Sequence, residues 1–304
     1  MREPGHHNQV PLCLGIPDSP QQKTTNYMTR LTITLASALT LMSVSARAER
    51  NDAAAEKLGL QLGMQCWTYR MLTTFETIER CQKFGIKYLE IFPGQKMKPG
   101  AEIAVGPGMS DAEIAELCGK AKTCGVKIAS FGVSDIPMDE PGMKKHFAWA
   151  KKVGLEVLVT EVTPNEALDK MAQATGIRIA LHNHPQSWPA DKVLAATKDL
   201  SKNCGSCADT GHWLRAGKDP IANLKLLDGR IIESHFKDLD EKKEDVVFGS
   251  GIANVKGMLQ ELKRQGFHGH LNMEYEHGDL AHLDATIPQC VAAFDKIANE
   301  ISKQ

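Results

Sequence analysis

The sequence predicts an α/β fold, a single (β/α)₈ barrel, and three observations support this prediction. Short apolar runs of strand type alternate with helical segments, a pattern typical of a parallel sheet. Eight such runs follow residue 55, enough to close the sheet into a barrel of roughly 250 residues. Imidazole and carboxylate side chains end the last four runs, and the carboxyl ends of the strands are where such a barrel carries its active site.

The order of the elements follows from their patterns of apolar residues. A unit of glycine, apolar, charged and apolar residues recurs at Gly85, Gly125, Gly154 and Gly176, and it indicates the end of a helix followed by a strand. An open doubly wound sheet is the competing fold, but no Gly-x-Gly-x-x-Gly follows the first strand. The predicted strands are Leu62–Trp67, Lys87–Phe92, Lys127–Gly132, Glu156–Glu161, Arg178–His182, Ser206–Asp209, Ile231–His235 and His270–Glu274.

Helices are predicted between most of these strands. Thr73 with Glu76, and Ser110 with Glu113, form two capping boxes, each of which marks the start of a helix. Two further helices are expected over Met258–Gln265 and Cys290–Ile301.

The N-terminal part of the chain is not expected to belong to the barrel. Arg30 precedes an apolar stretch over 31–44, and an Ala-Arg-Ala sequence ends at Ala48. This order predicts a signal peptide over 28–48, cleaved near Ala48, with export to the periplasm or outside the cell. A first helix of the domain is the alternative. Residues 1–27 are expected to be disordered or a misassigned extension before a true start at Met28, and the catalytic barrel is expected over 56–304.

Charge and cysteine content limit the classes of function. The formal net charge is −1, so no basic field is available to hold a nucleic-acid backbone. We expect no nucleic-acid partner and no membrane span in the mature form; a homo-oligomer is left open. Of the eight cysteines, Cys204 and Cys207 have the spacing of a zinc or redox pair. No second pair accompanies them, so we expect core residues, with a disulfide as the alternative.

Four strand-end stretches predict a metal site. They are Leu-His182-Asn-His184, Ala-Asp209-Thr-Gly-His212, Ser-His235-Phe-Lys-Asp and Met-Glu274-Tyr-Glu-His. Because the carboxyl ends of the barrel strands converge, these side chains are expected to surround one divalent metal ion. Neutral imidazole together with carboxylate oxygen suits Mn²⁺, Zn²⁺, Co²⁺ or Fe²⁺ better than Mg²⁺ or Ca²⁺.

Together with Gly249-Ser-Gly251, these stretches resemble the xylose-isomerase-like barrel superfamily. That superfamily contains sugar isomerases and epimerases, inosose dehydratases, keto-glycoside lyases and AP endonucleases. The resemblance implies metal ligands at His182, Asp209, His235 and Glu274. The fifth-strand ligand of the superfamily is usually a Glu, so His182 is a departure, and Glu161 is the alternative fourth ligand.

Roles follow for the neighbouring side chains. His184 is the candidate acid or base, because imidazole titrates near neutral pH; a supporting or alternative ligand role is left open. Glu274 is a second candidate for moving the proton, and Lys237 is expected to stabilise an enediolate charge. The remaining candidates are expected to bind substrate or shape the pocket; they are His212, which the resemblance implies, and Trp67, Arg215 and Glu276.

The leading functional prediction is a metal-dependent sugar isomerase or epimerase. It would act on a hydroxy-keto sugar or polyol through α-proton abstraction and a metal-held enediolate. With His182 in place of a Glu, a symmetric two-base epimerase is in doubt, so a lyase or hydratase on a 3-keto-glycoside or inosose is the alternative. A barrel that only binds sugars is a minor alternative. A nuclease of the AP-endonuclease kind is disfavoured, because the second and third strands lack histidine.

Overall fold

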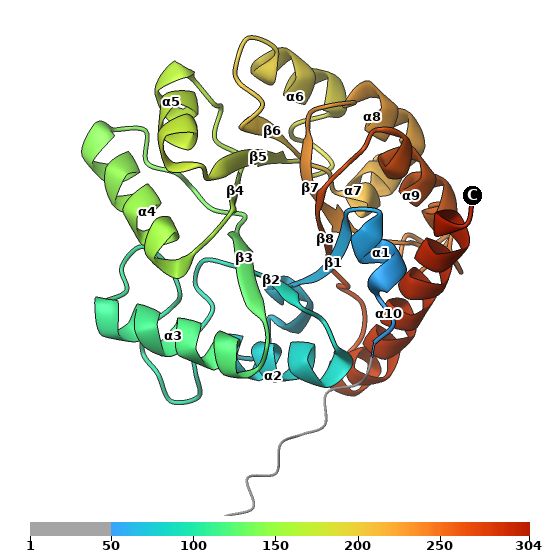
Figure 1. Cartoon of the computed structure of the whole chain (residues 1–304), viewed down its shortest axis with the longest axis horizontal. Helices are drawn as coiled ribbons and strands as arrows, with labels where there is room; N and C mark the ends of the chain where they lie inside the picture. Colours follow the sequence, from blue (N-terminus) through green and yellow to red (C-terminus); the bar gives the residue numbers. More distant parts are fainter. Residues whose placement is uncertain (1–49) are drawn as a thin grey trace, which may run out of the picture. The chain divides into compact units, whose positions relative to one another are not determined.

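Eight parallel strands close into one barrel in the computed structural model, which describes residues 50–304 (Figure 1). Each strand pairs with the next along the chain, and the last pairs with the first, where Leu60 lies opposite Gly269. This confirms the predicted fold. The strands are β1 (Leu60–Gln65), β2 (Tyr88–Ile91), β3 (Lys127–Phe131), β4 (Val157–Thr160), β5 (Arg178–His182), β6 (Cys204–Cys207), β7 (Ile231–Phe236) and β8 (Gly269–Met273).

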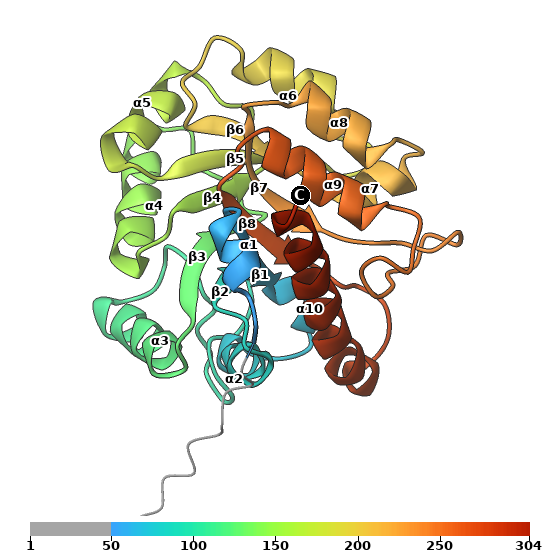
Figure 2. The ribbon, with the colours of Figure 1, turned by 45° about the vertical axis from the view of Figure 1, so that its right-hand side comes forward.

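Helices surround the strands as an outer layer (Figure 1). The short α1 (Ala53–Lys57) precedes the first strand, and the 3₁₀ helix η1 (Cys66–Tyr69) follows it. The others are α2 (Thr74–Phe84), α3 (Asp111–Thr123), α4 (Glu140–Val153), α5 (Glu166–Thr175), α6 (Ala190–Thr197), α7 (Thr210–Arg215), α8 (Pro220–Leu226), α9 (Val255–Arg264) and α10 (Leu280–Ser302). In Figure 2, α8, α9 and α10 lie along one flank of the barrel. None of the helices within residues 50–304 is long and apolar enough to span a membrane.

The helix ends are formed by the predicted local signals. Thr73 and Ser110 both make complete capping boxes with the glutamate three residues later. Gly85, Gly154 and Gly176 end their helices in the left-handed conformation, with φ of 73°, 86° and 74°. Glycine adopts this conformation without a Cβ penalty, which is why the chain can turn from helix to strand at these points.

Several predicted boundaries are wrong by a few residues. Glu161, Asp209 and Glu274 were placed inside strands, but each lies just after its strand has ended. The terminal helix begins at Leu280 and continues through Pro288. The signal peptide predicted over 28–48 and the extension over 1–27 lie outside the described residues.

Of the seven cysteines of the described residues, six are buried and Cys118 is partly buried against the core. Cys204 and Cys207 both lie in β6, are buried and carry free thiols. The disulfide alternative is therefore wrong in this structure. Burial raises the pKa of the Cys204 thiol to about 12, so it is not a reactive thiolate at neutral pH.

Candidate metal centre

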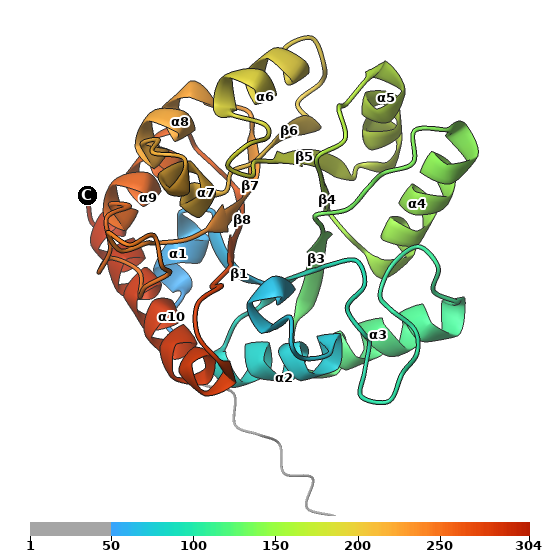
Figure 3. The same cartoon turned by 180° about the vertical axis from the view of Figure 1, so that it is seen from behind.

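The predicted ligands meet at the carboxyl end of the barrel, where loops and η1 follow the strands (Figure 3). His182 closes β5 and His235 lies in β7, whereas Asp209 and Glu274 follow β6 and β8. A cavity of about 380 Å³ opens at this point. It is lined by His182, His184, His212, His235, Glu274 and Glu276 and by Gln65, Trp67, Phe92, Pro93, Gly132 and Val133.

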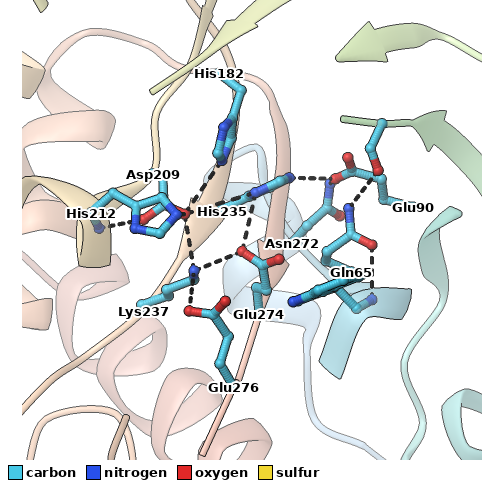
Figure 4. A network of polar contacts seen from close by, with 12 residues as sticks. Gln65, Glu90, His182, Asp209, His212, His235, Lys237, Asn272, Glu274 and Glu276 are labelled. Atoms are coloured by element: carbon cyan, nitrogen blue, oxygen red, sulfur yellow. Dashed lines mark hydrogen bonds and ion pairs between the residues drawn. The ribbon is translucent and has the colours of Figure 1, made fainter. Parts of the chain in front are cut away.

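Four donor atoms of these side chains lie close together (Figure 4). Asp209 Oδ2 is 3.5 Å from His182 Nε2 and 3.9 Å from His235 Nδ1. His235 Nδ1 is in turn 3.2 Å from Glu274 Oε2. Ligands held about 2.1 Å from one tetrahedral ion lie roughly 3.4 Å apart, so these separations are those of a metal-ligand set.

Three of the four donor atoms are buried: His182 Nε2, Asp209 Oδ2 and His235 Nδ1. The two histidine nitrogens make no hydrogen bond but face carboxylate oxygens at 3.2–3.9 Å, and Asp209 Oδ2 forms an ion pair of 3.0 Å with Lys237 Nζ. A buried polar atom without a hydrogen bond is costly, and two imidazole nitrogens that face carboxylate oxygens in this way fit a divalent cation. His212 Nε2 lies 3.6 Å from Asp209 Oδ2 and can extend the set. The residues present therefore fit the metal that the sequence predicts.

A buried carboxylate orients His235 from the other side of its ring. Glu90 Oε2 accepts from His235 Nε2 at 2.9 Å and from Asn272 Nδ2 at 2.8 Å. With its proton on Nε2, His235 presents the lone pair of Nδ1 to Asp209 and Glu274. The sequence did not reveal this role of Glu90, because 145 residues separate it from His235 and only the barrel brings them together.

Asp209 combines two functions in one side chain. Its Oδ1 accepts from the His212 backbone N–H at 2.6 Å and so caps α7, which leaves Oδ2 for the donor set. Asn183 fixes the Asp209 backbone through two hydrogen bonds of 2.9 and 3.0 Å. Burial alone would raise the pKa of Asp209, but Lys237 and His212 outweigh it, so the pKa lies well below its ordinary value.

Lys237 lies behind the donor set rather than in the cavity. Its fully buried Nζ is 2.7 Å from Glu274 Oε2, 3.0 Å from Asp209 Oδ2 and 3.0 Å from Glu276 Oε2. Burial alone would lower the pKa of Lys237, but these carboxylates raise it above its ordinary value. The sequence predicts that Lys237 stabilises an enediolate; in the structure its ammonium is enclosed by three carboxylates, two of which belong to the candidate ligands Asp209 and Glu274.

Arg215 is also displaced from its predicted role. Its guanidinium donates to Glu276 Oε2 at 2.5 Å and to Asp245 Oδ2 at 3.0 Å, and it does not line the cavity. Glu276 does line the cavity, where it bridges Lys237 and Arg215. Arg215 therefore supports the wall of the site, whereas Glu276 remains available to a ligand.

The mouth of the cavity holds a second group of polar side chains. His184 is half exposed and contacts Glu161 Oε1 through Nδ1, and His182 Nδ1 lies 3.5 Å from the same oxygen. The hydrogen bond from His182, together with that from His184, outweighs the effect of partial burial and lowers the pKa of Glu161 to about 2. Burial lowers the pKa of His212 to about 4, so this imidazole is neutral at pH 7.

The opposite wall is apolar. Trp67 in η1 is 40% exposed, and its ring packs edge-on against Phe92 with centroids 5.1 Å apart. Gln65 holds the adjoining wall through a 3.2 Å hydrogen bond to the Gly132 carbonyl. Trp67, a predicted substrate contact, lines the cavity, whose walls thus combine histidine and carboxylate groups with apolar side chains.

The fold and the site define a class of protein: a (β/α)₈ barrel with a histidine and carboxylate centre at the carboxyl ends of its last four strands. Comparison with known proteins gives the family. The family model described as "Xylose isomerase-like TIM barrel" matches residues 163–296. The chain belongs to this xylose isomerase-like barrel superfamily.

Individual relatives agree with this membership. Inosose dehydratase from Lacticaseibacillus casei is 26% identical over 134 residues, which are 36% of this chain and 44% of that protein. The match thus spans less than half of the curated relative. A solved structure of an uncharacterized protein from Parabacteroides distasonis is 35% identical, with a TM-score of 0.65, and the match covers 78% of this chain and 99% of that one. A D-psicose 3-epimerase structure shares the fold at 15% identity, with a TM-score of 0.62 and coverage of 78% and 99%.

Proposed function

We propose that this chain is a divalent-metal-dependent enzyme that removes the proton next to the carbonyl of a hydroxy-keto sugar or polyol, with isomerisation or epimerisation as the outcome. The observation that carries the proposal is the convergence of three buried donor atoms on one edge of the cavity, two of which are histidine nitrogens without a hydrogen bond. Inosose dehydratase and sugar 3-epimerases among the similar proteins support the substrate class.

The residues divide the work between holding the ion and moving the proton. When bound among His182, Asp209, His235 and Glu274, a divalent ion would polarise a carbonyl and acidify the neighbouring C–H. His184 and Glu274 both line the cavity, so either can exchange that proton with a substrate. Glu276, which also lines the cavity, can accept a hydrogen bond from a substrate hydroxyl.

The cavity accounts for the expected size and polarity of the substrate. Its volume of about 380 Å³ lies within the range of small-ligand sites. Trp67 and Phe92 offer apolar surface to the C–H face of a sugar ring, while the histidine wall offers polar groups to its hydroxyls.

Elimination of a leaving group is the second candidate, and one observation favours it. The fifth strand ends in His182, whose Nε2 faces Asp209, rather than in a second carboxylate. An epimerase that uses a carboxylate base on each face of the substrate needs two carboxylates, and this site has a histidine in place of one of them. A lyase or hydratase on a 3-keto-glycoside or inosose needs one base and one acid, which His184 and Glu274 can supply.

One experiment separates these outcomes. Purified protein loaded with Zn²⁺, Mn²⁺ or Co²⁺ is incubated with ketoses, inososes and 3-keto-glucosides in deuterated water and followed by NMR. Deuterium at the α-carbon with an isomeric product supports the isomerase or epimerase, whereas an unsaturated product or a released aglycone supports the lyase. If no substrate exchanges its proton under any metal, the proposed function is refuted.

Variants connect the metal to this activity. Asp209→Ala and Glu274→Gln should each abolish turnover and weaken metal binding by at least about tenfold, because each removes a ligand from the set. Asp199→Ala, which changes an exposed carboxylate near the end of α6, is the matched control and should behave as wild type. A fully active Asp209→Ala, Glu274→Gln double variant would contradict the metal assignment.

Export and assembly remain part of this proposal. The signal peptide expected over 28–48 supports a periplasmic or secreted enzyme, and mass spectrometry of the mature N-terminus would test cleavage near Ala48. The oligomeric state is open to light scattering of the purified chain.

A further inference from the structure

Glu161 is the carboxylate that the proposed reaction does not use, although it lies beside both histidines of the fifth strand. It directly follows β4, whose Thr160 is paired with Leu181 of β5. This register places Glu161 next to His182. His184, two residues further on, lies on the same side, and the two imidazole rings have centroids 4.5 Å apart.

One oxygen of Glu161 collects the contacts. His184 Nδ1 contacts Glu161 Oε1 closely, and His182 Nδ1 lies 3.5 Å from it. Ser187 Oγ donates to the same oxygen at 3.1 Å. At neutral pH a Glu carboxylate is ionised and can only accept hydrogen bonds, so His184 Nδ1 carries a proton. His182 lies between two carboxylates, with Nδ1 3.5 Å from Glu161 Oε1 and Nε2 3.5 Å from Asp209 Oδ2. When its Nε2 gives its lone pair to a metal ion, the proton of His182 lies on Nδ1 and faces Glu161.

The position of these protons decides what the other ring nitrogens can do. A neutral imidazole with its proton on Nδ1 has its lone pair on Nε2. His182 Nε2 is the buried atom that lies 3.5 Å from Asp209 Oδ2 in the ligand set, and a metal ligand must offer a lone pair. His184 lines the cavity, so the same tautomer leaves its Nε2 able to take a proton from a bound molecule.

We infer that Glu161 is a positioning residue that fixes the Nδ1–H tautomer of both His182 and His184, and so prepares a metal ligand and a proton acceptor with one carboxylate. The inference rests on the proposed function in naming those two roles. It assigns Glu161 a role distinct from the alternative of direct ligation.

A purely structural role would act through the loop that follows β5. Ser187 belongs to this loop, and Trp188 Nε1 donates to the Glu161 backbone carbonyl at 2.9 Å. Glu161→Gln preserves the shape of the side chain and the backbone contact with Trp188 but removes the charge. Ser187→Ala removes the hydrogen bonds of Ser187 Oγ with Glu161 and with the His184 backbone N–H but leaves the contacts of both imidazole rings with the carboxylate, so it is the matched control.

The first test is the histidine tautomers themselves, read by ¹⁵N NMR of the metal-free full chain labelled on histidine. His182→Gln and His184→Gln assign the two signals. In wild type and Ser187→Ala we expect His184 as Nδ1–H, whereas Glu161→Ala, which removes both carboxylate oxygens, should shift it toward Nε2–H. Glu161→Leu gives the same comparison if the Ala variant does not fold.

The second test is the affinity for Co²⁺, followed by its visible absorption. Removal of a carboxylate that orients a ligand histidine typically lowers metal affinity 10- to 100-fold, and we expect a loss of about this size in Glu161→Gln with one equivalent of Co²⁺ still bound. Ser187→Ala should bind within about twofold of wild type.

Three results would overturn the inference. They are an unchanged His184 tautomer in Glu161→Ala, an equal effect of Ser187→Ala on tautomer and affinity, or a second equivalent of Co²⁺ that Glu161→Gln loses, which would make Glu161 a ligand. Neither measurement uses a substrate. A protein that turns over no sugar would therefore refute the proposed function, whereas the role of Glu161 would still be decided by the tautomer and Co²⁺ measurements.

Discussion

Lys237 provides the sharpest test of how the centre is held together. Its ammonium is fully buried and lies within 3.0 Å of oxygens of Asp209, Glu274 and Glu276. Lys237→Met keeps most of the side-chain volume but leaves the three carboxylates without this counter-charge. Removing one partner of a buried ion pair typically lowers the free energy of unfolding by 3–5 kcal/mol, roughly.

This loss should be visible as a lower melting temperature. For a domain of this size, about 1 kcal/mol corresponds to roughly 2–4 °C, so we expect metal-free Lys237→Met to melt at least about 6 °C below wild type in a calorimetric scan. Lys144→Met is the control, because Lys144 forms an exposed pair with Glu140, and such pairs contribute at most about 1 kcal/mol.

Metal addition separates this explanation from a simple packing defect. Because a divalent cation would neutralise the same carboxylates, Zn²⁺ should raise the melting temperature of Lys237→Met more than that of wild type. If Lys237→Met melts with the Lys144→Met control, or if Zn²⁺ stabilises it less than it stabilises wild type, the account of Lys237 as the counter-charge of the ligand set is refuted.

Two further predictions concern packing and pH. A Cβ on Gly211 would lie 2.5 Å from Lys237 Cδ, whereas one on Gly119 in α3 would meet nothing within 4 Å. Gly211→Ala should therefore lower the free energy of unfolding by about 1–3 kcal/mol, while Gly119→Ala should raise it by up to about 1 kcal/mol. Urea unfolding measures both changes. Burial lowers the pKa of His146 in α4 to about 4, so the folded state binds the proton less readily than the unfolded chain does. The free energy of unfolding is therefore unaffected by His146 above pH 6.5 and falls by at most about 3 kcal/mol as the pH drops toward 4. His146→Leu should remove that part of the acid destabilisation, and identical pH profiles for variant and wild type would contradict it.

The sequence predicted the barrel well because its signals are local. The capping box at Thr73, the glycines after α2, α3, α4 and α5 and the alternation of apolar residues each act within a few residues, and the structure confirms them. The predicted boundaries are wrong where packing between distant residues, rather than the local sequence, determines where a helix begins or ends. The helix α10 runs through Pro288, which a local rule treats as a breaker.

The candidate site was predictable to a different extent. Its candidate ligands could be grouped in advance because parallel strand ends converge, and the structure brings the four predicted side chains together. The supporting residues could not be identified in this way. Glu90 reaches His235 across the interior of the barrel, and only three-dimensional packing shows that Lys237 is enclosed by carboxylates rather than facing a substrate.

Asp238 and the Gly249-Ser-Gly251 turn, which are separate in the sequence, are joined in the structure. Its carboxylate accepts from the backbone N–H groups of Gly249, Gly251 and Ala253 at 2.8–3.0 Å. A Cβ on Gly251 would lie 2.4 Å from Asp238 Oδ1. The Asp of the seventh-strand stretch and the Gly-Ser-Gly turn are thus one structural unit, which anchors the loop directly after Lys237.

The histidine at the end of β5 links the electrostatics of the centre to its choice of metal. With His182 in place of a Glu, the ligand set holds two carboxylates, and Lys237 lies within 3.0 Å of an oxygen of each. A set with less negative charge and more imidazole holds hard cations such as Mg²⁺ weakly and favours Zn²⁺, Co²⁺ or Fe²⁺. An imidazole nitrogen binds such an ion only when it offers a lone pair, so the proposed centre depends on the carboxylates beside its histidines, Glu90 at His235 and Glu161 at His182, as well as on its candidate ligands.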